Sequence, residues 1–248
     1  MQETFYESER DLKEQVVHIL LYNTECPLHF HNSLEILYVV EGSVHYLCST
    51  NHIILNEGEA VFIPPFFSHR FYSEGPSITE TVMIPDRYLH NFQRFYGDIT
   101  LPILNDIEVN RKITEIFHEI RDNGGEANNP FLIHGLVDYL LGYLITNYPQ
   151  FPYDKENKLM VDIAIYINEN FQSKLTLESI SSYFGYNPNY FSRLFKKLFN
   201  CNFNEYINNI RCQFIDNNRG KSSLTELIYR AGYSSPSSYY RRKRKHIR

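Results

Sequence analysis

The sequence predicts an α+β protein with two domains, an N-terminal β-barrel followed by an all-α domain. Three observations lead to this prediction. Short runs typical of strands fill the first third of the chain, apolar residues then recur at helical spacing, and the two halves carry opposite net charge. With 248 residues, of which 43% are hydrophobic, the chain is long enough to build two cores.

The barrel is predicted within residues 15–85. Runs rich in Val, Ile, Phe and Tyr alternate there with turn-like groups, which is typical of an all-β unit. The turn-like groups are Glu41-Gly42, Asn56-Glu57-Gly58, Pro64-Pro65 and Gly75-Pro76. Two helices are predicted to follow within residues 104–148, because isoleucines and leucines recur there three and four positions apart.

Residues 149–154 are predicted to be a linker, because they contain two prolines and no periodic pattern. The predicted domains are therefore 1–148 and 155–248. Residues 1–154 carry eight Lys and Arg against 22 Asp and Glu, a net charge of −14, whereas residues 155–248 carry 16 against seven, a net charge of +9. This segregation indicates that only the second domain binds a polyanion, although a basic solvated face is the simpler alternative.

A weak internal repeat marks the second domain. In each copy a short apolar helix precedes a Gly-Tyr turn, and a proline suited to the first turn of a helix follows, at Pro188 and Pro236. Ser223 and Glu226 stand in capping-box spacing at the start of the second copy. The order helix, tight glycine turn, helix predicts two helix-turn-helix units.

The helix predicted at 188–199 is amphipathic. Its apolar stripe consists of Phe191, Leu194, Phe195 and Leu198. Its opposite face carries Asn189, Ser192, Arg193, Lys196 and Lys197. Amide, hydroxyl and guanidinium groups suit base edges and lysines suit phosphates, so this face is predicted to bind DNA. The alternative of an ordinary solvated face is disfavoured by the repeat and by the charge segregation.

A helix of about 16 residues, roughly 24 Å long, is predicted between the two units. Adding one helix diameter of about 10 Å gives near 34 Å, which is one turn of B-DNA. One chain is therefore expected to place two recognition helices in successive major grooves.

The region from Leu175 to Arg211 resembles the DNA-binding domain of AraC/XylS regulators, and the second unit resembles the second unit of that family. The first part of the resemblance rests on Gly185, Pro188, Tyr190, Phe191, Ser192, Arg193, Leu194, Phe195, Lys196, Lys197, Phe203, Glu205, Tyr206 and Arg211, and the second part on residues 223–226 and 231–233. The resemblance implies groove contacts from both recognition helices. The predicted DNA-binding residues are Asn189, Ser192, Arg193, Lys196, Lys197, Ser237, Tyr240, Arg241 and Arg242.

The end of the sequence departs from this family. A basic run follows Tyr240, and the phenylalanine expected near Lys243 is missing. The second helix-turn-helix unit is therefore expected to have an atypical, shortened C-terminus with a weakly held last helix. A regulator whose DNA binding is impaired by this C-terminus is one alternative function.

The first domain resembles a cupin, because His29, His31, Glu35 and Gly42 are followed by Gly58, Pro64 and His69 in the spacing of the two cupin motifs. AraC/XylS regulators commonly carry such a barrel, which implies effector sensing, with dimerisation through the helices near 107–121 and 131–147. The predicted effector site, suited to a small polar molecule such as a sugar, consists of His29, His31, Glu35, Tyr38 and His69.

The same histidines and carboxylate are also typical ligands of a transition metal, so a metal-dependent cupin enzyme with a helical appendage is the competing function. Our prediction for this site has no catalytic residue, no bound metal and no other cofactor. The four cysteines lack metal-ligand spacing and are expected to be reduced thiols.

The chain has no apolar leader and no apolar run of about 18 residues, so we expect a cytoplasmic protein without membrane contact. The predicted function is sequence-specific, effector-modulated control of transcription. The predicted partners are double-stranded DNA, a small-molecule effector and a second copy of the chain in a homodimer, with RNA polymerase as a further candidate.

Overall fold

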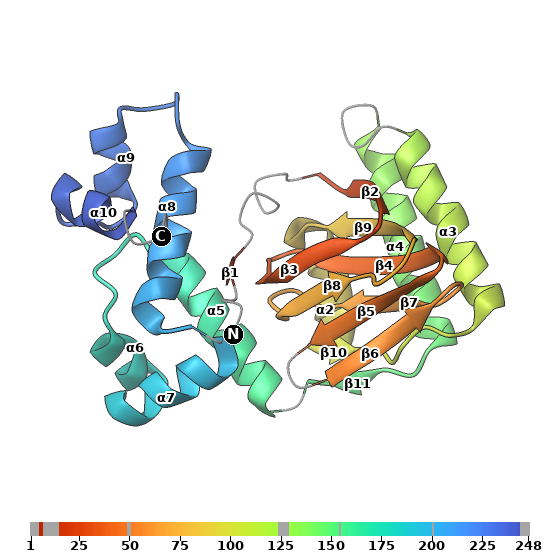
Figure 1. Cartoon of the computed structure of the whole chain (residues 1–248), viewed down its shortest axis with the longest axis horizontal. Coiled ribbons are helices and arrows are strands. Elements are labelled where there is room, and N and C mark those ends of the chain that lie inside the picture. The colour runs from red at the N-terminus through yellow and green to blue at the C-terminus, as the bar shows by residue number, and fades with distance from the viewer. Residues whose placement is uncertain are drawn as a thin grey trace. The chain divides into compact units, whose positions relative to one another are not determined.

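The computed structural model describes residues 5–6, 15–48, 51–123, 129–153, 155–199 and 201–243. The chain divides into two compact units, one of residues 13–158 and one of residues 159–248 with 1–12 (Figure 1). The first unit contains the sheets and the second is built mainly of helices, so the predicted α+β architecture is confirmed.

Two antiparallel sheets form the barrel of the first unit. In one sheet the strand order is β2, β9, β4, β7, and in the other the strands β3, β8, β5 and β6 are neighbours in that order. The strands of the first sheet are β2 (Val17–Tyr22), β9 (Ile78–Ile84), β4 (Leu34–Glu41) and β7 (Ala60–Ile63). Those of the second are β3 (Glu25–Phe30), β8 (His69–Tyr72), β5 (Ser43–Cys48) and β6 (Asn51–Asn56).

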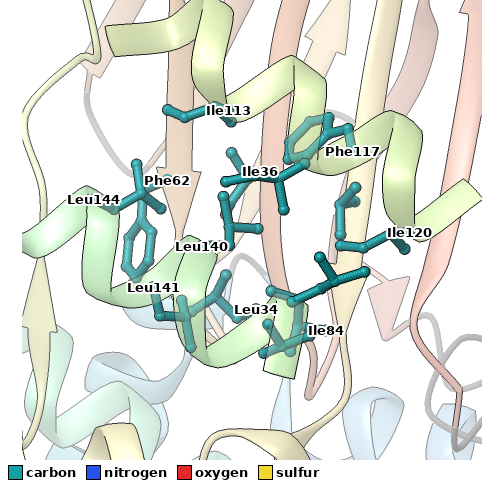
Figure 2. Close-up of a cluster of buried hydrophobic side chains, with 14 of the residues drawn as sticks. Leu34, Ile36, Phe62, Ile84, Ile113, Phe117, Ile120, Leu140, Leu141 and Leu144 are labelled. Atoms are coloured by element: carbon teal, nitrogen blue, oxygen red, sulfur yellow. The ribbon is translucent and has the colours of Figure 1, made fainter. Parts of the chain in front are cut away.

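Helices α3 (Ile107–Asp122) and α4 (Pro130–Asn147) cover one face of the β2, β9, β4, β7 sheet (Figure 1). Both helices are capped, because Asp106 accepts hydrogen bonds from two backbone amides of the first turn and Asn129 accepts one. Figure 2 shows how their apolar sides meet the sheet in one core. This core includes Leu34, Ile36, Phe62, Ile84, Ile113, Phe117, Ile120, Leu140, Leu141 and Leu144.

Short elements complete the barrel unit: the 3₁₀ turn η1 (Asp86–Tyr88), α2 (His90–Tyr96), β10 (Ile99–Thr100) and β11 (Phe151–Pro152). Strand β11 lies inside the segment predicted to be a linker, and it pairs antiparallel with β10. The Tyr153 amide also donates to the Asp98 carbonyl at 3.0 Å. The described part of this segment is therefore held on the barrel, whereas Asp154 lies outside the described residues. The boundary between the domains stays a prediction.

The second unit contains the short strand β1 (Phe5–Tyr6) and six helices among its described residues. The helices are α5 (Lys155–Asn170), whose first turn belongs to the first unit, α6 (Leu177–Tyr183), α7 (Pro188–Phe199), α8 (Phe203–Asn217), α9 (Leu224–Arg230) and α10 (Pro236–Lys243). Helices α6 with α7, and α9 with α10, are the two predicted helix-turn-helix pairs. The predicted cap is present, because Ser223 Oγ accepts from the Glu226 amide at 3.2 Å.

The last described helix, α10, is anchored by Tyr239, whose side chain is only 1% exposed. Tyr239 packs in a core with residues of α8, α9 and the turn between α9 and α10. A buried tyrosine therefore supplies an apolar contact within α10, whereas the expectation of a weakly held last helix stays a prediction for the basic residues that follow. Residues 244–248 of the basic run lie outside the described residues. None of the described helices is long and apolar enough to cross a membrane.

Candidate functional site

Four buried polar side chains meet between the two sheets of the barrel. His29 and His69 are directly paired across β3 and β8, His31 follows β3, and Glu35 comes from β4 in the other sheet. Their potential ligand atoms all lie within 4.8 Å of one another. We call these four residues the histidine cluster.

Backbone carbonyls orient the three imidazole rings. The Nδ1 atoms of His29, His31 and His69 lie 2.8–2.9 Å from the carbonyl oxygens of residues 27, 33 and 67 respectively. A carbonyl oxygen only accepts hydrogen bonds, so each Nδ1 carries a proton. His31 Nε2 lies 2.9 Å from the Glu35 carboxylate and donates to it, whereas the Nε2 atoms of His29 and His69 face the interior of the cluster.

The cluster is rich in hydrogen-bond acceptors. Burial, together with the nearby His69, lowers the pKa of His29 to about 2, which keeps this ring neutral. Burial by itself would raise the pKa of the Glu35 carboxyl, but the hydrogen bond with His31 at 2.9 Å and the nearby His69 hold it well below its usual range. Glu35 is therefore an ionised carboxylate in the barrel interior.

His69 Nε2 is buried and has no hydrogen-bond partner among the described residues. It lies 3.3 Å from Glu35 Oε2. Three imidazole nitrogens with one carboxylate oxygen fit a divalent transition metal. The carbonyl contacts at Nδ1 are the kind of secondary interaction that orients histidine ligands. A metal would be held by the four residues of the cluster.

Tyr38 does not belong to this site. Alternate residues of a strand point to opposite faces, and Glu35 and Tyr38 on β4 differ by an odd number of positions. Tyr38 instead packs beside the core that α3 and α4 form with the sheet. The prediction of Tyr38 as an effector contact is therefore corrected, whereas the other four predicted residues are brought together.

Two further residues line the cluster, and neither was among the predicted site residues. Cys26 Sγ lies 3.5 Å from His29 Nδ1, and the Phe71 ring centroid lies 5.5 Å from that of His69. Phe71 was accessible to sequence reasoning, because it is two positions from His69 and shares its strand face. Cys26 was not, because a register shift in β3 separates it from His29.

The second unit presents the predicted recognition face on α7. Phe191, Phe195 and Phe199 are buried on one side of this helix. The five predicted DNA-binding residues of the helix are all exposed: Asn189, Ser192, Arg193, Lys196 and Lys197. The Asn187 side chain accepts from the Asn189 amide at 3.0 Å and so fixes the start of the helix.

Helix α10 repeats this arrangement. Ser237, Tyr240 and Arg241 are exposed, while Tyr239 between them is buried. The Arg242 side chain lies outside the described residues. Ser235 Oγ accepts from the Ser238 amide at 3.3 Å, so a polar residue before the proline caps this helix as well.

Comparisons with known proteins match one domain model to each of these two regions. A cupin-domain model matches residues 16–85, and a helix-turn-helix domain model matches residues 180–248. An uncharacterised HTH-type transcriptional regulator of Staphylococcus aureus strain COL is 22% identical over 225 residues, which are 85% of this chain and 30% of the relative. The chain thus spans about a third of the length of this relative. The HTH-type regulator YijO of Escherichia coli K12 is 41% identical over 59 residues, 24% of this chain and 21% of YijO.

The fold is shared with ToxT from Vibrio cholerae. One ToxT structure superposes with a TM-score of 0.54 at 11% identity, over 92% of this chain and 93% of ToxT. A ToxT structure with a bound unsaturated fatty acid gives 0.53 at 12% identity, over 94% of this chain and 92% of ToxT. The chain therefore joins a region that matches a cupin domain to a region that matches a helix-turn-helix domain, in a fold that resembles that of ToxT.

Proposed function

We propose that this chain is a cytoplasmic, sequence-specific transcription regulator that binds double-stranded DNA and responds to a small molecule in its barrel. The observation that carries the proposal is the division of α7 into a buried phenylalanine side and an exposed face with Asn189, Ser192, Arg193 and Lys196. The net charge of +9 in residues 155–248 adds the electrostatic attraction that phosphate binding needs.

The effector is a molecule that donates hydrogen bonds. The ionised Glu35 carboxylate accepts hydrogen bonds, so hydroxyl or ammonium groups complement it. A polyol or sugar has this chemistry. A carboxylate placed there would add a second negative charge beside Glu35, so we expect a fatty acid, which ToxT binds in one of its structures, to be disfavoured at this position.

The barrel interior is connected to the chain segment before α5. The loop 64–67 contacts the histidine cluster twice, because the Phe66 amide donates to the His31 carbonyl and His69 Nδ1 donates to the Phe67 carbonyl. Phe66 has a φ of 65°, a left-handed conformation that costs a bulky residue about 1–3 kcal/mol. The Phe67 ring packs on Tyr153 at 4.9 Å. A ligand that moves His69 therefore acts on Tyr153, and a His69→Ala chain should show faster hydrogen exchange at the Tyr153 amide.

A second copy of the chain is the proposed partner for α4. Phe131 and Tyr139 are exposed on this helix, at 88% and 51%. Gly135 and Gly142 have open space where a Cβ would be, although a glycine inside a helix costs about 1 kcal/mol relative to alanine. Close approach of another helix would explain their presence. Sedimentation of the full chain should show a dimer that Gly135→Leu weakens. Contact with RNA polymerase stays a prediction.

Binding-site selection with the full chain and random duplex DNA tests the main proposal. We expect a two-part motif, with each part read by one recognition helix and the two parts about one helical turn apart. An Arg193→Ala chain should lose preference in one part only. Recovery of no motif, with binding equal for all sequences, would remove the proposal of sequence-specific regulation.

A metal-dependent cupin enzyme is the second candidate, favoured by the closeness of the four ligand atoms in the histidine cluster. A bound transition metal would supply Lewis-acid chemistry there. Elemental analysis with matched His31→Ala and His69→Ala chains separates the candidates. The regulator proposal predicts no stoichiometric metal and DNA binding that is unchanged by a chelator. Stoichiometric iron, manganese, nickel or zinc that both variants lose, together with metal-dependent turnover, would favour the enzyme.

A further inference from the structure

We propose that Arg211 is a positioning residue that fixes the second helix-turn-helix unit against the segment leading into the first, and so sets the spacing between the two DNA segments. This inference rests on the proposed DNA-binding function. Arg211 lies on α8, the helix that joins the two units, and is not one of the predicted DNA contacts.

One side of the Arg211 guanidinium binds the turn that follows α5. Its Nε donates to the Phe171 carbonyl and its Nη2 donates to the Ser173 carbonyl, both at 2.8 Å. These carbonyls follow the C-terminal end of α5, where unpaired carbonyls and the helix dipole favour a cation. The turn leads directly to Thr176, the N-cap of α6 in the first helix-turn-helix unit.

The other side of the guanidinium contacts the turn of the second unit. The Arg211 guanidinium carbon lies 5.6 Å from the centroid of the Tyr233 ring. Gly232, the preceding residue, has a φ of +88° and lies so close to the first turn that an added Cβ would be 2.7 Å from the Phe171 carbonyl oxygen. The turns of residues 171–173 and 232–233 are therefore in direct contact, with Arg211 hydrogen-bonded to the first and lying over the Tyr233 ring of the second.

The contact continues into the second recognition helix. The Tyr233 ring packs edge-on against Tyr239 of α10 at 5.7 Å, and the Tyr233 hydroxyl lies 3.5 Å from Cys212 Sγ. Since Tyr239 is buried, a displacement of Tyr233 would also displace α10. Arg211 thus acts on DNA readout through Tyr233 and α10.

The guanidinium group is specifically suited to this role. Its planar fork reaches two carbonyls at once while its face lies over an aromatic ring, whereas an ammonium group is a compact point charge. Without the guanidinium group, helices α9 and α10 would be attached to the rest of the helical unit mainly through α8. One base pair of spacing corresponds to about 3.4 Å along the DNA axis, so a small displacement of α10 changes which spacing fits.

The test uses the full chain and the motif that the wild-type protein selects. Duplexes carry its two parts with the spacer shortened or lengthened by one or two base pairs, and dissociation constants are measured for the wild type, Arg211→Gln and Arg211→Lys. Arg230→Gln is the matched control, because it removes an equal charge from an exposed arginine on α9 whose guanidinium lies over the Phe214 ring rather than over Tyr233.

We expect the wild type and Arg230→Gln to lose about tenfold in affinity for each wrong spacer, comparable to a mismatched base pair. Arg211→Gln should bind all spacers within about threefold of one another and still bind the isolated α7 half-site like the wild type. The spacing preference of Arg211→Lys should lie between those of the wild type and Arg211→Gln. An unchanged spacing preference in folded Arg211→Gln would overturn the inference.

Hydrogen exchange of residues 171–176 and 231–239 gives a readout that needs no DNA. Exchange should be faster in Arg211→Gln than in Arg230→Gln, and unchanged exchange would overturn the inference even if the wild type selects no motif. Selection of no motif by the wild type would by itself refute the proposed function. If Arg211→Gln does not fold, Gly232→Ala should loosen the same contact through its Cβ, and a Gly232→Ala chain with wild-type spacing preference would contradict the inference.

Discussion

The two units of this protein differ in where their functional polar groups lie. The barrel unit is acidic and buries a carboxylate with three histidines between its sheets, whereas the helical unit is basic and keeps its recognition side chains in solvent. A buried polar site has few positions and fixed partners, so it suits one small ligand. An exposed cationic face suits a long polyanion. The contrast supports the proposal that sensing and DNA binding belong to different units.

Salt dependence is the largest expected difference between the units. If about six phosphates are neutralised, DNA affinity of the full chain should fall by roughly 10³ between 50 and 200 mM salt. Lys196→Ala should lower the log-log salt slope by about one, while Lys112→Ala on α3 of the barrel unit should leave it unchanged. Equal effects of the two substitutions, measured by fluorescence anisotropy, would contradict the assignment of DNA binding to the helical unit.

Core substitutions test whether the units unfold separately. Phe195 in α7 and Phe117 in α3 are both fully buried, in different units. Each Phe→Ala change should cost about 3–5 kcal/mol in the free energy of unfolding of its own unit. Calorimetry should therefore show Phe195→Ala lowering one transition and Phe117→Ala lowering the other. A single transition shifted by both would mean that the units unfold as one.

Base readout is the next test. Arg193 is exposed on α7 and lies nearer the start of the helix than Lys196. A bidentate guanidinium contact contributes about 1–3 kcal/mol of base discrimination. Arg193→Ala should relax the preference at one or two operator positions, whereas Lys196→Ala should weaken binding similarly for all sequences. A wild-type motif of unchanged strength from the Arg193→Ala chain would show that α7 does not read bases.

Sequence reasoning succeeded where a local period decides the structure. The 3.6-residue period of α7 placed Phe191 and Phe195 inside and Arg193 and Lys196 outside, as observed. The cupin-like spacing predicted that His29, His31, Glu35 and His69 share one site, and the structure places them together. Tyr38 was predicted at the site, but the period of two along β4 places it on the strand face opposite Glu35, beside the core with α3 and α4.

Non-local contacts were the part that the sequence could not supply. The segment 149–154 has the composition of a linker, yet its strand β11 pairs with β10 about 50 residues earlier. A two-residue pairing leaves no periodic signal. Arg211 was visible only as part of a family resemblance, because its partners lie in two turns on either side of α8 in the sequence. The anchoring of α10 by Tyr239 depends likewise on a core shared with α8 and α9.

The smallest expected effect concerns pH and a second polar cluster of the barrel unit. Glu80 on β9 lies 3.0 Å from His118 of α3 and 3.7 Å from His18 of β2. Burial would raise the pKa of the Glu80 carboxyl, but the nearby His18 and the hydrogen bond with His118 lower it below its ordinary value. The carboxyl therefore stabilises the folded unit at pH values above its unfolded pKa, and this contribution disappears as the pH falls through the folded pKa.

Glu80→Gln should accordingly reduce the free energy of unfolding of the barrel unit by about 1 kcal/mol near neutral pH, because His118 is partly exposed and solvent screens the pair. The difference from the wild type should shrink on acidification below about pH 4.5. Glu115→Gln is the matched control, since its exposed ion pair with Lys112 is also on α3 but is screened by salt. In 1 M salt the Glu115 effect should vanish while most of the Glu80 effect remains. A Glu80 effect that is independent of pH between 3 and 7 would show that the carboxylate charge does not hold α3 on the sheet.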